Sequence, residues 1–415
     1  MEWPIMVPMK QKLDRTRIDD LESTLRAGIR TRLNSAKFST GDSVAVGVGS
    51  RGITPLVQVV STIVSELKSA GLKPFIVPAM GSHGGATADG QKAVLAEYDI
   101  VQSVVRAEVR ATMEVIELGS GPSGQTFFGD AIAYHADHIV VIGRVKPHTD
   151  FRSDIESGLC KMTSVGLGKQ VGAERIHEMG LAEMVPEGAQ VAIDTNKILM
   201  GIALVENAYD EPVHCRVVEA AKFHQTDREL LIKAKDILPR LPVNHLHLLV
   251  VDEMGKNISG AGMDTNIVGF WRLLSHGPKD PDFQYLATLR LTEESGGNAT
   301  GVGIADFVSP NLVASIDYEK TYMNGLTSLG IAASKIPLHL TSDETTLEAA
   351  YTAASRIAGR SVPRMIRIKN TMLLEHFWAS PPVVTELEEN GSAIKEGDGE
   401  PFSFSNTGEL VQLTN

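Results

Sequence analysis

The chain has 415 residues, of which 43% are hydrophobic and 22% are charged, a balance that can fill the cores of two globular domains. Such a composition excludes a disordered chain, collagen and a coiled coil. The formal net charge of −12 has the wrong sign for a protein that covers a polyanion, so we expect neither nucleic acid nor an anionic membrane as a partner.

The first residues and the two cysteines indicate the compartment. Glu2 and Pro4 stand where a signal peptide carries positive charge and then an unbroken apolar stretch, and no later window has the length of a membrane span. Cys160 and Cys215 could form at most one bridge, so we expect reduced thiols. These features predict a soluble, cytoplasmic protein.

Short apolar strands alternate with amphipathic helices along the first half of the chain. The pattern predicts strands at 43–49, 74–79 and 138–142, helices at 56–68 and 87–98, and short helices within 157–179. A β-hairpin is expected around 207–212, followed by a helix at 227–237. Alternation of this kind is typical of a mostly parallel sheet with helices on both faces.

A second α/β layer is predicted beyond Pro242. Its elements are a strand at 247–251, a glycine-rich loop at 255–262, an apolar segment at 304–316 and a helix at 344–357. We therefore expect two α/β domains with mostly parallel sheets, at 1–242 and 243–385. The acidic, turn-rich tail at 386–415 is expected to pack back on the first domain.

Chemically reactive side chains follow three of the predicted strands. Arg51 comes after the first strand, His83 after the second and His148 after the third. Because ligands of open α/β sheets bind beyond the carboxyl ends of the strands, these residues are expected to line one site. Each of them could instead be an ordinary surface or loop residue, and their shared position is what favours a functional role.

Familiar phosphate and metal motifs are missing from the sequence. The segment 157–169 superficially resembles a phosphate-binding loop, but Lys169 is followed by Gln170 and not by a hydroxyl residue. The glycine pattern of a dinucleotide site is absent after the first strand, as are paired-cysteine, His-Glu-x-x-His and EF-hand patterns. An ordinary all-protein zinc or calcium site is therefore not expected.

The order and spacing of the motifs resemble those of the lactate racemase family, whose members depend on a nickel pincer nucleotide. The residues that carry the resemblance are Arg51, Gly81-Ser82-His83, Lys146-Pro147-His148, Lys161 and His177. The likeness covers about the first 180 residues and extends more loosely to Arg272, which stands where the family has a cofactor-contacting lysine.

The resemblance implies a two-domain enzyme with its active site in the cleft between the domains. Lys161 would be joined to a pyridinium mononucleotide that carries a thioamide and a thiocarboxylate, and His177 would complete the coordination of nickel. Arg51 and Arg272 would grip the phosphate of the nucleotide. His83 and His148 would act as the acid–base pair on opposite faces of the substrate.

Two features depart from the family pattern. Gly84 and Gly85 follow the first histidine, where lactate racemases commonly carry an arginine that could hold the carboxylate of a small substrate. The stretch between His148 and Lys161 is longer than in the family and holds the charged residues Arg152, Asp154 and Glu156, which we expect to be solvated loop charges.

The identity of the tethering lysine has two candidates. Lys161 is preferred because it lies sixteen residues before His177, as the family pattern requires, and Lys169 is the alternative. Either amine could form the covalent link that retains the cofactor.

The residue types suit hydride transfer. Removing the carbon-bound proton of a 2-hydroxy acid would place a carbanion beside a carboxylate, whereas loss of a hydride gives a planar 2-oxo acid that can be reduced on either face. Two histidines supply a base for each isomer. Sulfur donors and one imidazole suit nickel, which explains how His177 could be the only protein ligand.

The sequence thus predicts a racemase or epimerase of a 2-hydroxy acid, with the enzymes that make its cofactor as partners. One alternative is a protein that binds or carries the organonickel cofactor without turnover. The other is a nickel-independent α/β enzyme that acts on a phosphorylated or carboxylated metabolite.

Overall fold

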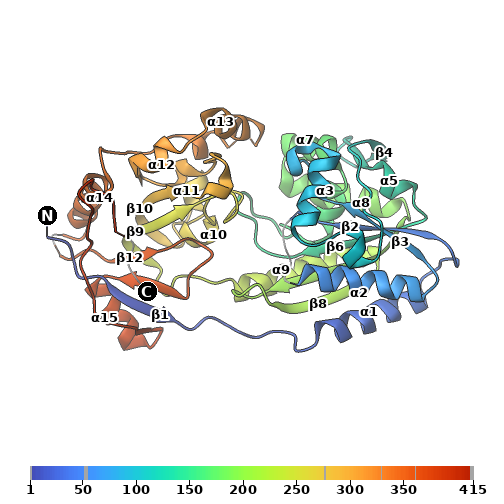
Figure 1. The fold of residues 1–415 in the computed structure, drawn as a ribbon, viewed down its shortest axis with the longest axis horizontal. Coiled ribbons are helices and arrows are strands. Elements are labelled where there is room, and N and C mark those ends of the chain that lie inside the picture. The colour runs from blue at the N-terminus through green and yellow to red at the C-terminus, as the bar shows by residue number, and fades with distance from the viewer. Residues whose placement is uncertain (1, 51–54, 275–276, 329, 360, 412–415) are drawn as a thin grey trace. The chain divides into compact units, whose positions relative to one another are not determined.

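The computed structural model describes residues 2–50, 55–274, 277–328, 330–359 and 361–411. The chain divides into two compact units. The first unit is Asp14–Leu238, and the second unit consists of Met1–Leu13 together with Pro239–Asn415. Each unit contains its own sheet and its own helices (Figure 1).

The first unit is built on a five-stranded sheet with the order β3-β2-β6-β7-β8. Its strands are β2 (Ser43–Val48), β3 (Lys73–Pro78), β6 (His138–Arg144), β7 (Ile198–Glu206) and β8 (Pro212–Val218). The first four strands in this order are parallel, and β8 pairs with β7 in the antiparallel direction. A two-stranded ribbon, β4 (Val115–Ser120) with β5 (Thr126–Asp130), lies outside this sheet.

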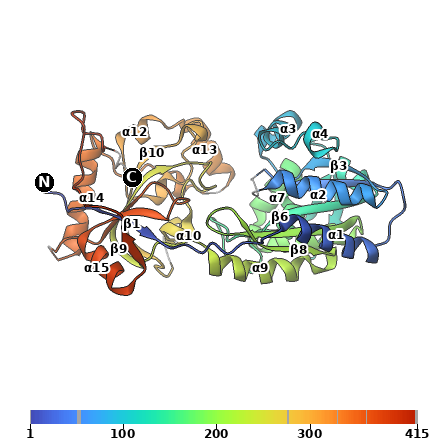
Figure 2. The same ribbon diagram turned by 60° about the horizontal axis from the view of Figure 1, so that its bottom comes forward.

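Helices cover both faces of this sheet (Figure 2). They are α1 (Leu21–Ser35), α2 (Leu56–Ser69), α3 (Ala88–Glu97), α4 (Gln102–Val105), α5 (Ala131–His135), α6 (Leu159–Lys161), α7 (Lys169–Met179), α8 (Leu181–Asp194) and α9 (Phe223–Ile237). Helices α1 to α4 pack on one face and α5 to α9 on the other. Because neighbouring side chains of a strand point to opposite faces, Val44 and Ala45 of β2 belong to different cores.

The second unit contains a seven-stranded sheet with the order β11-β10-β9-β12-β13-β1-β14. Its strands are β1 (Val7–Gln11), β9 (His245–Met254), β10 (Asp282–Leu291), β11 (Phe307–Val308), β12 (Met365–Ile368), β13 (His376–Ala379) and β14 (Ala393–Lys395). Strands β11, β10, β9 and β12 are parallel, and the other three pair in the antiparallel direction.

The helices of the second unit are shorter on average. They are α10 (Thr265–Val268), α11 (Trp271–Leu274), α12 (Pro310–Ala314), α13 (Tyr318–Thr327), α14 (Asp343–Ile357) and α15 (Pro381–Asn390). Single 3₁₀ turns occur in the two units at Gly84–Ala86, Ala220–Lys222, Glu293–Ser295, Val302–Ile304 and Ala332–Ser334, and a π-helical turn at Met162–Gly166.

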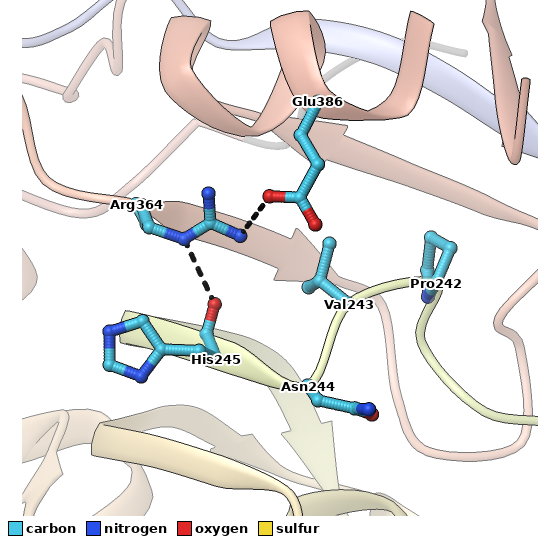
Figure 3. A pocket seen from close by; sticks show the side chains of 6 residues that line it. All are labelled: Pro242, Val243, Asn244, His245, Arg364 and Glu386. Carbon is cyan, nitrogen blue, oxygen red and sulfur yellow. Dashed lines mark hydrogen bonds and ion pairs between the residues drawn. The ribbon is translucent and has the colours of Figure 1, made fainter. Parts of the chain in front are cut away.

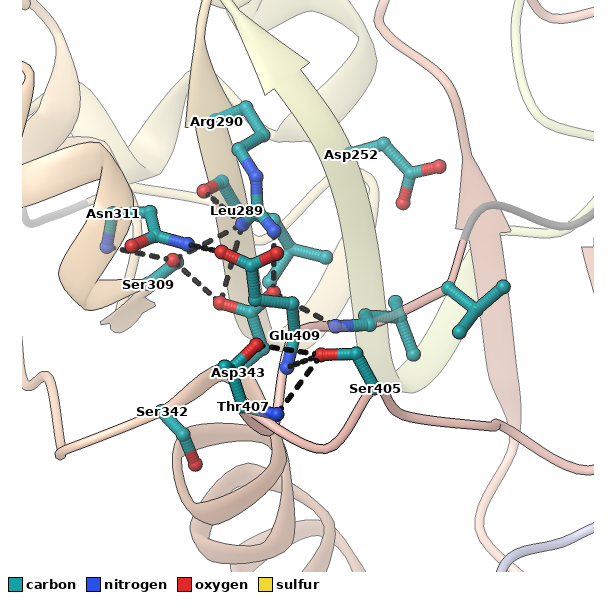
Figure 4. A network of polar contacts seen from close by, with 12 residues as sticks. Asp252, Leu289, Arg290, Ser309, Asn311, Ser342, Asp343, Ser405, Thr407 and Glu409 are labelled. Carbon is teal, nitrogen blue, oxygen red and sulfur yellow. Dashed lines mark hydrogen bonds and ion pairs between the residues drawn. The ribbon is translucent and has the colours of Figure 1, made fainter.

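The end of the chain is fastened to the second unit by a buried carboxylate (Figure 4). Asp343, the first residue of α14, accepts hydrogen bonds from Arg290 Nη2 at 2.6 Å, Ser309 Oγ at 2.6 Å and the backbone N–H of Leu410 at 2.9 Å. The pKa of Asp343 is lowered although burial opposes this, because these donors stabilise the charged form.

The α/β fold with mostly parallel sheets that the sequence predicts is confirmed. The predicted strands and longer helices are present as β2, β3, β6, β9, α2, α3, α9 and α14. The division of the chain differs in two places. The first thirteen residues group with the second unit, and so does the tail, because β14 pairs with β1 and Leu410 is held by Asp343.

Two further properties concern the cysteines and the helices. Cys160 and Cys215 are both free thiols. None of the helices in the described part of the chain combines the length and the apolar character needed to cross a membrane.

Candidate functional site

Three neighbouring parallel strands of the first unit deliver the predicted histidines to one edge of the sheet. Strands β3 and β6 both pair with β2, so their carboxyl ends lie about 10 Å apart, two strand spacings. His83 follows β3, His148 follows β6, and Ser50 follows β2 between them. Arg51 lies outside the described residues.

His83 is exposed on a loop that is held by the buried side chain of Gln91. Nδ1 of His83 lies 2.5 Å from Ser50 Oγ. The buried side chain of Gln91 donates from Nε2 to the carbonyl oxygens of Gly81 at 2.8 Å and of His83 at 3.3 Å. These contacts hold the imidazole at the sheet edge while its ring remains accessible.

Gly84 cannot be replaced by the arginine that lactate racemases commonly carry. Its φ of +66° lies in the left-handed region, and a Cβ atom there would approach the backbone nitrogen of Gln91 to 2.7 Å. The departure from the family pattern is therefore part of the local fold.

His148 and Lys161 meet directly. Lys161 ends the short helix α6, and its Nζ lies 2.5 Å from Nε2 of His148. Both side chains are partly buried. The ring of Phe151 stacks at 4.5 Å from the imidazole and supplies an apolar wall.

The hydrogen bonds of His148 assign its tautomer. The backbone N–H of Asp150 donates to Nδ1 at 3.1 Å, so this nitrogen carries no proton. In a neutral imidazole the proton then sits on Nε2, which points at Lys161 Nζ. This arrangement accommodates Lys161 as a neutral amine, the nucleophilic form.

A buried carboxylate braces the backbone of His148. Glu156 accepts the N–H of His148 at 2.8 Å and is 0% exposed, so the expectation that it is a solvated loop charge is wrong. Lys235 of α9 contacts the same carboxylate at 2.7 Å. Arg152 and Asp154 are exposed as expected, and Asp154 pairs with Arg228.

A second buried carboxylate caps the helix that ends at Lys161. Asp227 of α9 accepts the N–H of Leu159 at 3.0 Å and of Cys160 at 2.7 Å. Burial raises the pKa of Asp227 to about 6 in spite of these hydrogen bonds. Gly158, at φ +87°, makes room for this cap, because a Cβ there would lie 2.3 Å from Oδ1 of Asp227.

Lys169, the alternative tethering lysine, is fully buried. Its Nζ pairs with Asp130 at 2.8 Å and donates to Pro78 O at 2.6 Å and Gln91 Oε1 at 3.0 Å. Burial lowers the pKa of Lys169, and the carboxylate of Asp130 opposes this shift. Because three protein groups use its ammonium, Lys169 serves to join β3, α3 and β5, and the geometry favours Lys161 for a covalent link.

His177 has the arrangement of a single-imidazole metal ligand. It lies exposed on α7, and its Nδ1 donates to the carbonyl oxygen of Ala173 at 2.6 Å. This leaves the lone pair on Nε2, the usual pattern for a metal-binding histidine whose second nitrogen is held by the backbone. Among the described residues no three His, Cys, Asp or Glu side chains form a metal cluster, so any metal held here would draw its other donors from elsewhere.

Arg272 does not fit the role of a phosphate contact. Its side chain is 3% exposed and its guanidinium pairs with Asp306 at 2.7 Å. It also donates to the carbonyl oxygen of Phe283, near the amino end of β10, whereas ligands of such sheets bind at the carboxyl ends. We therefore regard Arg272 as a structural residue of the second unit.

A surface depression of about 520 Å³ lies at the amino ends of strands in the second unit (Figure 3). It is lined by residues next to the start of β9 and β12, including His245 and Arg364. Arg364 is neutralised by Glu386 at 2.6 Å, and His245 contacts Asp282 at 3.0 Å. The two cationic side chains of this depression are thus each paired with a carboxylate.

Sequence reasoning missed three residues that shape the site: Glu156, Asp227 and Lys235. Charged residues are mostly exposed, so their types gave no signal of burial. Gly158 was the one available hint, since a glycine just before a helix marks a close approach of backbone to another group.

Comparison with known proteins supports the family resemblance. Residues 5–151 match the family model described as the lactate racemase N-terminal domain. The structure of the lactate racemase apoprotein from Thermoanaerobacterium thermosaccharolyticum is similar with a TM-score of 0.51 and 13% identity, covering 89% of this chain and 98% of that chain. A search of curated proteins gives no match.

Proposed function

We propose that this chain, a member of the lactate racemase family, is a racemase or epimerase of a 2-hydroxy acid. The observation that carries the proposal is the 2.5 Å contact between Lys161 Nζ and His148 Nε2, at the sheet edge to which His83 is also delivered. An amine and two imidazoles at one edge are the groups that a covalently held cofactor and a reversible proton transfer require.

The residues of the first unit fit a nickel pincer nucleotide. Lys161 would hold it through a covalent bond to Nζ, and His177 would bind nickel through Nε2. When bound, such a cofactor would supply an acceptor for the hydrogen on C2 of the substrate as a hydride. The enzymes that make the cofactor are accordingly the partners we propose for this chain.

The two histidines move the proton of the substrate hydroxyl. Ser50 fixes Nδ1 of His83, and the backbone of Asp150 fixes Nδ1 of His148, whose Nε2 faces Lys161. One ring accepts the hydroxyl proton of one isomer, and the other ring donates a proton to form the opposite isomer. Because Gly84 excludes an arginine, we do not assign lactate as the substrate.

The first test uses protein that is co-produced with the cofactor-making enzymes. Intact mass spectrometry should show a covalent adduct and bound nickel, and Lys161→Arg should lack the adduct. Lys197→Arg is the matched control, because Lys197 is a partly buried lysine of the same unit whose Nζ binds the carbonyl of Ala136.

The second test offers a panel of chiral 2-hydroxy acids deuterated at C2. An inverted centre that keeps its deuterium supports hydride return, and His83→Ala or His148→Ala should keep the adduct while losing about 10²–10⁴-fold in rate. Turnover by unmodified, metal-free protein would select a nickel-independent enzyme. An adduct with no inversion across the panel would select a cofactor carrier.

A further inference from the structure

We propose that helix α9 is a positioning element of the site, which sets the Lys161–His148 contact through Asp227 and Lys235. The inference rests on the proposed function only in taking Lys161 and His148 as active-site residues. Helix α9 lies outside the part of the chain that the family model matches, and its contacts come from this structure alone.

The segment that needs positioning has little regular structure. Between the end of β6 at Arg144 and the start of α6 at Leu159, the chain forms neither helix nor strand. A hydrogen bond between Lys161 and His148 nevertheless requires both side chains to be placed within a fraction of an ångström. Contacts within the segment, such as that from Arg152 Nη1 to the carbonyl oxygen of His148 at 2.6 Å, are joined by contacts from α9.

One end of the segment is held by Asp227. Its carboxylate binds the two successive N–H groups of Leu159 and Cys160, which are the first of helix α6. This cap fixes the direction of the short helix and thereby the position from which Lys161 extends. Asp227 acts through the backbone of α6.

The other end is held through Lys235 and Glu156. Lys235 neutralises the buried carboxylate of Glu156 at 2.7 Å, and Glu156 in turn accepts the N–H of His148 at 2.8 Å. Asp227 and Lys235 are two helical turns apart, about 12 Å along the axis. A single helix therefore spans both ends of the segment.

Helix α9 is rigid enough for this task. Its apolar side chains Phe223, Leu230, Leu231 and Ala234 are buried in the core that also contains Leu159 and Cys160. Movement of α9 would displace Asp227 and Lys235 together. Helix α9 therefore supports both Lys161 and His148.

The reactivity of Lys161 reports its contact with His148 without any cofactor or substrate. A neutral amine is acylated and an ammonium is not, so we propose to label the full, unloaded chain with N-hydroxysuccinimidyl acetate. The rate at Lys161 is measured by peptide mass spectrometry relative to the exposed Lys92. Loss of one hydrogen bond should lower this ratio about tenfold.

The informative variant is Lys235→Met, at a partly exposed position that can be altered in folded protein. Lys233→Met, on the same helix, is the matched control. We expect the ratio to fall in Lys235→Met and Asp227→Asn, and in the reference variant His148→Ala, while Lys233→Met leaves it unchanged. The midpoint of the pH profile of labelling should move upward in the first two variants.

The outcomes separate this inference from the proposed function. If His148→Ala lowers the labelling of Lys161 but folded Lys235→Met and Asp227→Asn do not, α9 is not a positioning element. If His148→Ala does not change the labelling of Lys161, the contact between Lys161 and His148 is absent in solution. The inference is then overturned. Neither readout involves isomerisation, so a failure to find a substrate would leave the inference intact.

Discussion

Lys161 and Lys169 lie on the two sides of one π-helical turn, Met162–Gly166, and their surroundings are opposite in kind. Lys169 is fully buried and its ammonium is shared among Asp130, Pro78 and Gln91. Lys161 is partly buried, and its Nζ lies 2.5 Å from Nε2 of His148. The difference teaches that a lysine enclosed by fixed acceptors, such as Lys169, stabilises the fold. A lysine that faces an imidazole at the sheet edge, such as Lys161, is placed for chemistry.

The largest effect that would test this contrast is on stability. Replacing Lys169 by methionine leaves the buried carboxylate of Asp130 without its counter-charge, so the free energy of unfolding should fall by about 3–5 kcal/mol. Lys161→Met should change it by less than about 1 kcal/mol. Urea denaturation followed by circular dichroism measures both.

The double variant Lys169→Met with Asp130→Asn serves as the control. It removes both charges and should recover part of the lost stability, although Asp130 also caps α5 through Ala133. Equal stability of Lys169→Met and Lys161→Met would contradict the structural role of Lys169.

An intermediate effect is expected on the pH dependence of stability, through Asp227, which caps the helix that ends at Lys161. The pKa of Asp227 is raised from 3.8 to about 6, so at pH 5 the folded protein holds a proton that the unfolded chain has lost. Stability from this group therefore falls as pH rises from about 4 to 6, by up to about 1.4 kcal/mol per pH unit. Asp227→Asn should lack this slope.

Parallel urea titrations of the parent and Asp227→Asn between pH 4 and pH 8 make the comparison. The difference between the two unfolding free energies isolates this carboxyl group from all others. A difference that does not vary with pH would show that Asp227 is ionised in the folded protein at pH 5.

The smallest effect is expected at the exposed end of the same helix. Arg228 pairs with Asp154 on the surface, and it lowers the pKa of that carboxyl group. Because solvent screens such pairs, Arg228→Ala should change the unfolding free energy by less than about 1 kcal/mol and leave Lys161 labelling unchanged. A large change in either quantity would mean that α9 acts through its surface charges as well.

The strand ends of the site could be predicted because their signals are local. The apolar runs of β2, β3 and β6 are short, continuous and followed by glycine or polar residues, and this placed His83 and His148 at one edge. The contact between His148 and Lys161 could not be predicted, because it depends on the path of an irregular segment.

Other features depend on partners far away in the sequence. Glu156 and Asp227 are buried charges whose compensation comes from backbone groups and from α9, which no pattern of residue types reveals. The choice between Lys161 and Lys169 stayed open for the same reason, since spacing alone does not show which amine is enclosed. Strand β1 was missed because its partners lie at the other end of the chain.

That strand has a consequence for how the protein is made. Val7–Gln11 pairs with β13 and β14, which are synthesised roughly 370 residues later, and at about 5–20 residues per second this delay is roughly 20–70 s. During that time the ribosome releases the whole of Asp14–Leu238, which can fold while the first strand waits unpaired. A strand that is translated long before its partners is thus among the last to find its place, and a chaperone has its longest opportunity at Val7–Gln11.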